Sequence, residues 1–465
     1  MRGDNRGPET MRRHNGRRIV ALLLCIVPVS IWSYVIRRDF QSDIKMADFS
    51  TIYFAARCAV HRADPYDRAA YLQETISDKA SFATSSAIAK RDVDIFMRCV
   101  YLPTTLFAFI PFALPPWTIA QNLFLISIAF SLALAAWAIW DLAGVPAPVP
   151  CVGLVVFWLT NSMLLLLVGN PAGIVIGFGI VAAWCFLKKR YEPAGVVLLA
   201  LGLIIKPHDV GFVWLYFLLA GRGLRKRALQ AMALAAVVGI CSLIWIVPIS
   251  PHWTHELHSN VEADFAHGGI NDPGPGGITE RTFGPVISLQ NTLSIFKDNP
   301  HFYNPMSYLA GGGLLLVWAG LVLLKRFTRE GALLGLAAVS ILTMLPVYHR
   351  PHDAKLLALT IPGCAVLWAA RGASRWVALT LTAAAILVTS DLPIVFLTQA
   401  TKSLPTSVST LGGQLTLLLI HPAPLVLLAA GCFYLWAYVR YEPAAAAGET
   451  RGMPDRGERQ SSLQT

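Results

Sequence analysis

Long apolar runs alternate with short polar segments along almost the whole chain. Most of these runs approach the roughly 20 residues that a helix needs to cross a bilayer. A chain in lipid must satisfy its backbone hydrogen bonds internally, so each run predicts a helix. The pattern predicts an all-α polytopic membrane protein with about twelve crossings, at residues 19–36, 117–140, 151–168, 171–187, 193–205, 209–221, 228–249, 306–324, 331–347, 354–370, 376–397 and 414–439.

Three of the apolar segments need interpretation. The first run ends at Ile36-Arg37-Arg38 without a small-residue cleavage site, which predicts an uncleaved anchor. Segment 101–114 is short and bounded by prolines, so we expect a re-entrant or interfacial helix. Runs 193–205 and 209–221 are broken by Lys206-Pro207-His208-Asp209, which predicts a hairpin whose tip is recessed below the outer surface.

The short basic loops set the predicted orientation, because Lys and Arg in short loops are retained on the cytoplasmic side. Segments 188–190 and 222–227 then lie on the cytoplasmic side with the N-terminus. The predicted organisation is a cytoplasmic basic arm (1–18), a transmembrane domain (19–440) with large extracytoplasmic loops at 37–116 and 250–305, and a disordered cytoplasmic tail (441–465).

The composition narrows the class of protein. With 55% apolar and 14% charged residues, the chain is not a conventional soluble enzyme. Its net charge of +11 is expected at the faces of the bilayer, so no nucleic-acid partner is predicted. Cys58 and Cys99 are the two cysteines of the first outer loop. They predict either a disulfide that fixes the helix after the anchor or two buried thiols.

Acidic residues are the most informative polar class, because a carboxylate in lipid is costly and usually functional. Nearly all of them fall in loops, and Asp141, Asp209 and Asp391 only touch predicted helix ends. This distribution disfavours a proton-coupled transporter. Asp48 opens an amphipathic helix shortly after the anchor, where it is either a catalytic carboxylate held near the lipid surface or a helix cap.

The segment DFSTIYFAARCAVHRADPYD (48–67) resembles the first-loop signature of glycosyltransferase family 87, integral membrane enzymes of the GT-C fold. Further pieces follow in the family's order: Tyr101-Leu102-Pro103, Gly169-Asn170-Pro171, Lys206-Pro207, Gln290-Asn291-Thr292-Leu293 and His349–Asp353. The chain departs from the family pattern at 61–63, at Gly169-Asn170 and at 290–293, which leaves the sugar and the acceptor open.

The resemblance implies transfer of a sugar, typically mannose, from a polyprenyl phosphate to an acceptor hydroxyl with inversion at the anomeric carbon. Asp48 matches the family's catalytic aspartate, which acts as general base. Tyr53, Asp64, Tyr66 and Asn291 lie in matching segments and are candidates for binding the acceptor or the sugar. The expected partners are a lipid-linked donor, a glycolipid or glycan acceptor and membrane lipid, at the extracytoplasmic face of a bacterial inner membrane.

A departing polyprenyl phosphate needs positive charge around it. Lys206 at the helix break and the corner formed by His349, Arg350 and His352 are the candidates for binding the donor phosphate. A loop lysine and a helix-capping corner are the alternatives. The histidines His252, His255 and His258 are three apart, but no thiolate or motif completes a zinc site, so no metal and no cofactor is predicted.

Two other classes of function remain open at this point. A flippase or transporter for lipid-linked sugars would place charges along a pathway and show repeated halves, and the sequence shows neither. A non-catalytic assembly protein would tolerate Asp48→Asn.

Overall fold

The protein is described here by a computed structural model. It describes residues 46–77, 98–143, 146–275, 286–390 and 409–441, with a few residues between 26 and 37. The basic arm, most of the anchor, Asp391 and the tail from 442 lie outside the described residues. Within those ranges the chain forms eighteen α-helices, one 3₁₀ helix and no strand, which confirms the all-α prediction.

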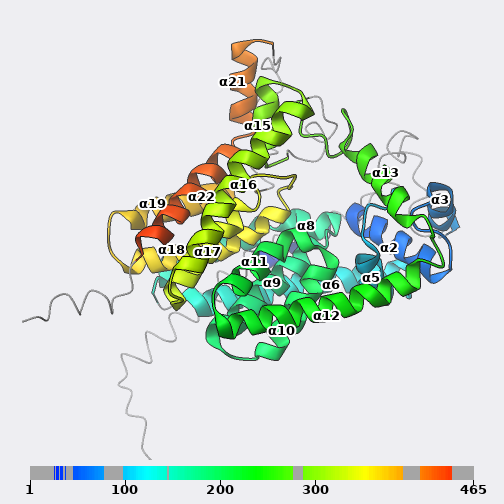
Figure 1. Ribbon diagram of the computed structural model, residues 1–465, viewed down its shortest axis with the longest axis horizontal. Coiled ribbons are helices and arrows are strands. Elements are labelled where there is room, and N and C mark those ends of the chain that lie inside the picture. The colour runs from blue at the N-terminus through cyan, green and yellow to red at the C-terminus, as the bar shows by residue number, and fades with distance from the viewer. Residues whose placement is uncertain are drawn as a thin grey trace, which may run out of the picture.

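Figure 1 shows the helices in their order along the chain. Three helices follow the anchor: α2 (Ala47–Val60), α3 (Arg68–Ser77) and α5 (Pro103–Ala113). A run of apolar helices comes next: α6 (Trp117–Ala143), α7 (Pro148–Thr160), α8 (Met163–Val168), α9 (Ala172–Lys188), α10 (Glu192–Ile205), α11 (Pro207–Leu219) and α12 (Arg222–Ile246).

The second half of the chain is also helical. The second outer loop contains α13 (Trp253–Phe265) and α15 (Leu289–Phe296). The remaining elements are α16 (Pro300–Leu324), α17 (Arg329–Leu342), the 3₁₀ helix η1 (Asp353–Leu359), α18 (Thr360–Ala369), α19 (Ser374–Val388), α21 (Leu411–Ile420) and α22 (Ala423–Arg440).

Five helical segments are long and apolar enough to cross a membrane, which indicates a multi-pass membrane protein. They are Trp117–Ala143, Pro148–Val168, Gly223–Ile246, Pro300–Leu324 and Ala423–Arg440. The predicted run 414–439 is interrupted, because the chain breaks between α21 and α22, and the segment in it that is long enough to cross is Ala423–Arg440. Pro422 lacks the backbone N–H that a continuous helix requires.

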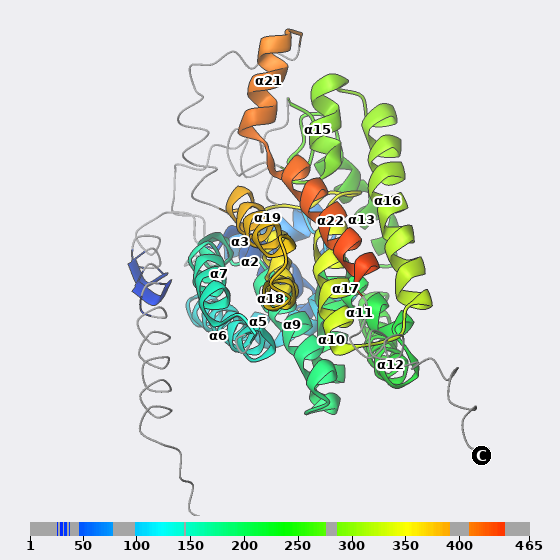
Figure 2. The same cartoon turned by 90° about the vertical axis from the view of Figure 1, so that its left-hand side faces the viewer.

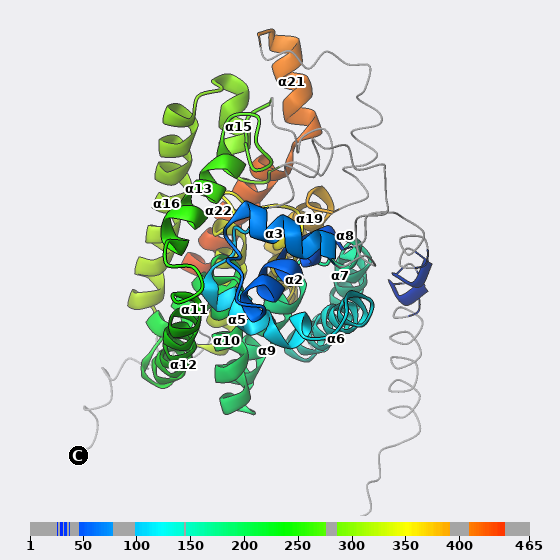
Figure 3. The same cartoon turned by 90° about the vertical axis from the view of Figure 1, so that its right-hand side faces the viewer.

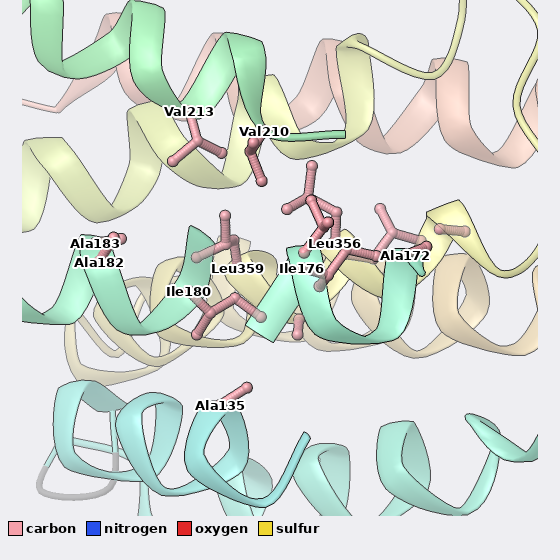
Figure 4. Close-up of a cluster of buried hydrophobic side chains, with 14 of the residues drawn as sticks. Ala135, Ala172, Ile176, Ile180, Ala182, Ala183, Val210, Val213, Leu356 and Leu359 are labelled. Carbon is pink, nitrogen blue, oxygen red and sulfur yellow. The ribbon is translucent and has the colours of Figure 1, made fainter. Parts of the chain in front are cut away.

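The core lies around α9, which packs against α6 on one side and α10 on another. Figure 4 shows Ile176 and Ile180 of α9 between Ala135 of α6 and the apolar side chains of α11 and η1. Gly177 allows the close approach of α6, since a Cβ there would lie 2.8 Å from the backbone oxygen of Ser131. Small residues serve the same purpose at helix interfaces in membranes.

The outer-loop helices and the tight turns occupy opposite ends of the molecule. Figures 2 and 3 show α15 and α21 projecting at one end, while the turn between α9 and α10 lies at the other. That turn contains the basic residues Lys188, Lys189 and Arg190.

Candidate functional site

Four segments that are distant in sequence meet at one polar cluster. Asp48 lies in the first turn of α2, and Asn170 lies just before α9. Lys206 forms the junction between α10 and α11, and residues 349–353 lead into η1. Proline marks two of these segments, because Pro171 and Pro207 favour the start of a helix. The polar side chains therefore project from helix ends rather than from within apolar helices.

Asn170 connects Asp48 to the rest of the cluster. Its Nδ2 donates to Asp48 Oδ2 at 2.7 Å and lies 3.1 Å from His352 Nε2. Its Oδ1 accepts a hydrogen bond of 2.9 Å from the backbone N–H of Ala172 at the start of α9. Since both ends of the amide are engaged, Asn170 holds the Asp48 carboxylate in one orientation.

Gly169 brings Asn170 close to α2. Its φ is +63°, a conformation that side-chain-bearing residues rarely adopt. A Cβ at this position would lie 2.8 Å from Met46 Cε and 2.8 Å from Phe49 Cβ, the residues on either side of the first turn of α2. The absence of a side chain at position 169 thus sets the distance between Asp48 and Asn170.

The surroundings of Asp48 favour a carboxylate that accepts protons more readily than usual. Burial raises the pKa of the partly buried Asp48 side chain. The hydrogen bond from Asn170 and the charges of Arg350 and Lys206 lower the pKa, but the balance leaves it above its ordinary value. A base is most effective when its pKa approaches the working pH.

Lys206 reaches the cluster, but two carboxylates already pair with it. Its Nζ donates to Asp353 Oδ1 and lies 3.2 Å from Asp209 Oδ2. The hydroxyls of Thr104 and Thr105 in α5 donate to the carbonyls of the last residues of α10 and so fix the junction. Lys206 is therefore present at the cluster, where it forms ion pairs with both carboxylates. Its role in binding the donor phosphate stays a prediction.

Arg350 connects the corner before η1 to the second outer loop. Its Nη2 donates to Ile270 O at 2.8 Å and to Asn271 Oδ1 at 3.0 Å. Its guanidinium lies over the Tyr348 ring, 5.7 Å from the ring centroid. Its Nε is buried and has no hydrogen-bond partner among the described residues. This N–H is therefore a donor that the described part of the chain does not use.

Both histidines of the corner are held neutral. Burial lowers the pKa of His352 to about 3, and its Nε2 accepts from Asn170. Burial also lowers the pKa of His349. The Nδ1 of His349 donates to the Val347 carbonyl at 3.1 Å, which leaves Nε2 as a buried acceptor without a partner.

No known protein family matches this chain, and no curated protein is similar to it. The function must therefore be inferred from the side chains of the site and from the resemblance of the short segments that build it.

Three other predicted binding residues take part in the protein's own hydrogen bonds. The Tyr53 hydroxyl donates to Pro115 O at 3.0 Å, and its ring is buried among aromatic side chains. Asp64 Oδ1 accepts from the backbone N–H of Tyr66 at 2.9 Å, as in an Asx-turn. The Tyr66 hydroxyl donates to Tyr101 O at 2.8 Å. All three side chains thus make contacts within the first outer loop, and their role in binding the acceptor or the sugar stays a prediction.

Asn291 and the two loop cysteines are also buried. Asn291 Nδ2 donates to Pro273 O at 3.2 Å and so fixes α15 to the second loop. Cys58 and Cys99 are free buried thiols, so of the two alternatives left open by the sequence the structure has the unbridged one. Burial raises the pKa of the Cys99 thiol to about 12.

Sequence reasoning did not identify Asn170, Asp209 and Asp353 as site residues. The local sequence could have indicated Asp209, because residues three apart at the start of a helix lie on one face and can form an ion pair such as Lys206–Asp209. The contact with Asp353 joins positions 147 residues apart, and no local pattern predicts it.

One group of side chains could hold a metal ion. One ligand atom each from His208, Asp209 and Asp353 lies within 4.8 Å of the others. The histidines at 252, 255 and 258 do not form such a group among the described residues, and His258 pairs with Glu262 at 3.1 Å on the surface.

Proposed function

We propose that this protein is an integral membrane glycosyltransferase that transfers a sugar, mannose by preference, from a polyprenyl-phosphate donor to an acceptor hydroxyl. The observation that carries the proposal is the convergence of four short segments on one cluster. The segments at Asp48, 169–171, 206–207 and 349–353 each resemble a piece of glycosyltransferase family 87, and their side chains contact one another. The proposed topology has about twelve crossings and a GT-C-like arrangement.

Asp48 acts as the general base in this proposal. The acceptor hydroxyl gives its proton to the carboxylate while its oxygen forms the new bond to the anomeric carbon. The bond from that carbon to the donor phosphate oxygen breaks with its electron pair, and the polyprenyl phosphate leaves. Attack opposite the leaving group inverts the anomeric centre. Asn170 keeps the carboxylate oriented, as proton transfer at hydrogen-bonding distance requires.

Arg350 is the residue we assign to the departing phosphate. Its guanidinium is always charged, and its Nε lacks a partner within the described ranges of the chain. Its contacts with Ile270 and Asn271 fix the group through the second outer loop, so the position of the charge is set before the donor binds. A preorganised charge stabilises the developing negative charge without reorganisation.

The cellular position of the site follows from the placement of the basic turns. The turn with Lys188, Lys189 and Arg190 lies at the end opposite α15 and α21 (Figure 2). If basic turns face the cytoplasm, the outer loops and their contacts with the site face away from it. We propose an extracytoplasmic site, with a donor that enters from the membrane.

A transfer assay with purified protein tests the proposal. Protein in detergent is supplied with polyprenyl-phosphate mannose and a panel of glycolipid acceptors, and the mannosylated product is quantified. We expect transfer by the wild type and a loss of at least about 100-fold in Asp48→Asn. Asp67→Asn is the matched control, because Asp67 is an exposed acid of the same loop that caps α3 and should leave transfer unchanged.

Equal transfer by wild type and Asp48→Asn, with both proteins folded by thermal unfolding, would remove Asp48 as the base. An absence of transfer with every acceptor, combined with movement of the donor across liposomes, would favour the transporter alternative.

A further inference from the structure

The cluster beside the proposed base contains the donor set of a metal site. His208 follows Pro207 at the start of α11, Asp209 is the next residue, and Asp353 opens η1. One ligand atom from each lies within 4.8 Å of the other two. The set combines one imidazole and two carboxylates, which suits Mn²⁺ or Zn²⁺ better than Mg²⁺.

A buried acceptor beside these ligands provides a second observation. Asp209 has a fully buried side chain, and its Oδ2 lies 3.2 Å from Lys206 Nζ. His349 is 1% exposed, and its Nε2 lacks a partner among the described residues. Its ring packs edge-to-face against that of His208, with 5.7 Å between the ring centroids. Because Nδ1 donates to a backbone carbonyl, Nε2 presents a fixed lone pair, an arrangement typical of metal-binding histidines.

Acidic side chains outnumber basic ones in the cluster. The carboxyl groups of Asp48, Asp209 and Asp353 gather around only two basic side chains, Lys206 and Arg350. A phosphate would add further negative charge to a buried site, where an uncompensated charge is costly. A divalent cation would compensate for the excess.

We propose that His208, Asp209 and Asp353 bind a divalent cation of the Mn²⁺ or Zn²⁺ kind, with His349 Nε2 as a further ligand. In the structure the Lys206 ammonium is the counter-charge of Asp209 and Asp353. A divalent ion bound to the same carboxylates takes over this role and releases Lys206. That release supplies a second cation for the donor phosphate, and this consequence alone rests on the proposed glycosyl transfer.

Direct metal binding tests the site. Chelator-treated full-length protein in detergent is titrated with Mn²⁺, and free Mn²⁺ is followed by electron paramagnetic resonance. We expect one Mn²⁺ per chain, displaced by Zn²⁺, with affinity reduced at least about tenfold in His208→Gln and in Asp209→Asn. His208 is half-exposed, so its variant should fold even if the buried Asp209 variant does not. His258→Gln is the matched control, since its exposed ring pairs only with Glu262.

A wild type that binds no Mn²⁺ at about 1 mM would overturn the proposal. Binding that is unchanged in His208→Gln and Asp209→Asn would overturn it as well. The readout does not depend on sugar transfer. Metal binding without transfer would reject the proposed function and keep the site, whereas transfer without metal binding would do the reverse.

Discussion

Replacing Asn170 with alanine isolates the contact that orients the proposed base. The substitution removes the 2.7 Å hydrogen bond to Asp48 Oδ2 and the 3.1 Å contact with His352 Nε2. It leaves Asp48, Arg350 and Lys206 in place. Asp48 is then a carboxylate in the same buried surroundings without its orienting partner.

The size of the effect follows from the kind of bond lost. A hydrogen bond to a charged group contributes about 1.5–3 kcal/mol. If this energy orients the carboxylate for proton transfer, kcat/KM at neutral pH falls roughly 10- to 150-fold. The hydrogen bond from Asn170 also determines in which direction the pH profile of the variant shifts. The bond from Asn170 lowers the pKa of Asp48, so its loss raises that pKa, and the acid limb of the profile moves to higher pH.

The assay is a pH profile of kcat/KM for mannosyl transfer by wild type and Asn170→Ala. Asn260→Ala is the control, because Asn260 also joins separate segments through its amide, by bonds of 3.2 Å to Tyr66 O and Cys99 O, but does not contact Asp48. If the acid limb moves equally in Asn260→Ala, the shift reflects a general loosening of the fold and not the loss of the bond to Asp48. An acid limb that stays in place in Asn170→Ala would refute the coupling of the two side chains.

Three further predictions concern the same cluster. Gly169→Ala introduces a Cβ into contact with Met46 and Phe49 at positive φ, and thermal unfolding should show a loss of about 1–3 kcal/mol together with weaker transfer. Arg350→Lys keeps the charge but loses the planar donor, so the KM for the donor should rise roughly tenfold while folding is retained; an unchanged KM would contradict the assignment. The pKa of His352 is lowered to about 3 in the folded protein, so the unfolded chain binds more protons below about pH 6.5 and stability should fall as the pH drops towards 3. His352→Gln cannot take up that proton and should flatten the dependence of the unfolding temperature on pH.

The helices were largely predictable because apolar runs and prolines determine them locally. The short segment 101–114 became α5, and the two runs around Lys206 became α10 and α11, with the break at the predicted Pro207. The predicted bounds differ for the last run, where the break at Pro422 was missed and the helix that could cross begins at Ala423. The polar loop 250–305 gave no apolar signal, yet it contains α13 and α15.

The site was predictable only in part, since sequence shows which residues are unusual and not which of them meet. Asp48, Lys206 and Arg350 were identified because charges are rare in this chain, and the structure brings them to one cluster. Tyr53 was a candidate for binding the acceptor or the sugar, and in the structure its side chain is buried in the aromatic core. The pairing of Lys206 with Asp353 was not predicted, because a partner so distant in the chain leaves no local pattern.

The distances along the chain between the partners have a consequence for biosynthesis. Asn170 joins Asp48 across 122 positions and His352 across 182. A nascent chain that ends before residue 349 holds Asp48, Asn170 and Lys206, but it lacks Arg350 and His352. If Asp48 is the base and Arg350 binds the departing phosphate, as proposed, such a chain has the base without the group that stabilises the leaving phosphate. Incomplete chains are then not expected to consume the lipid-linked donor.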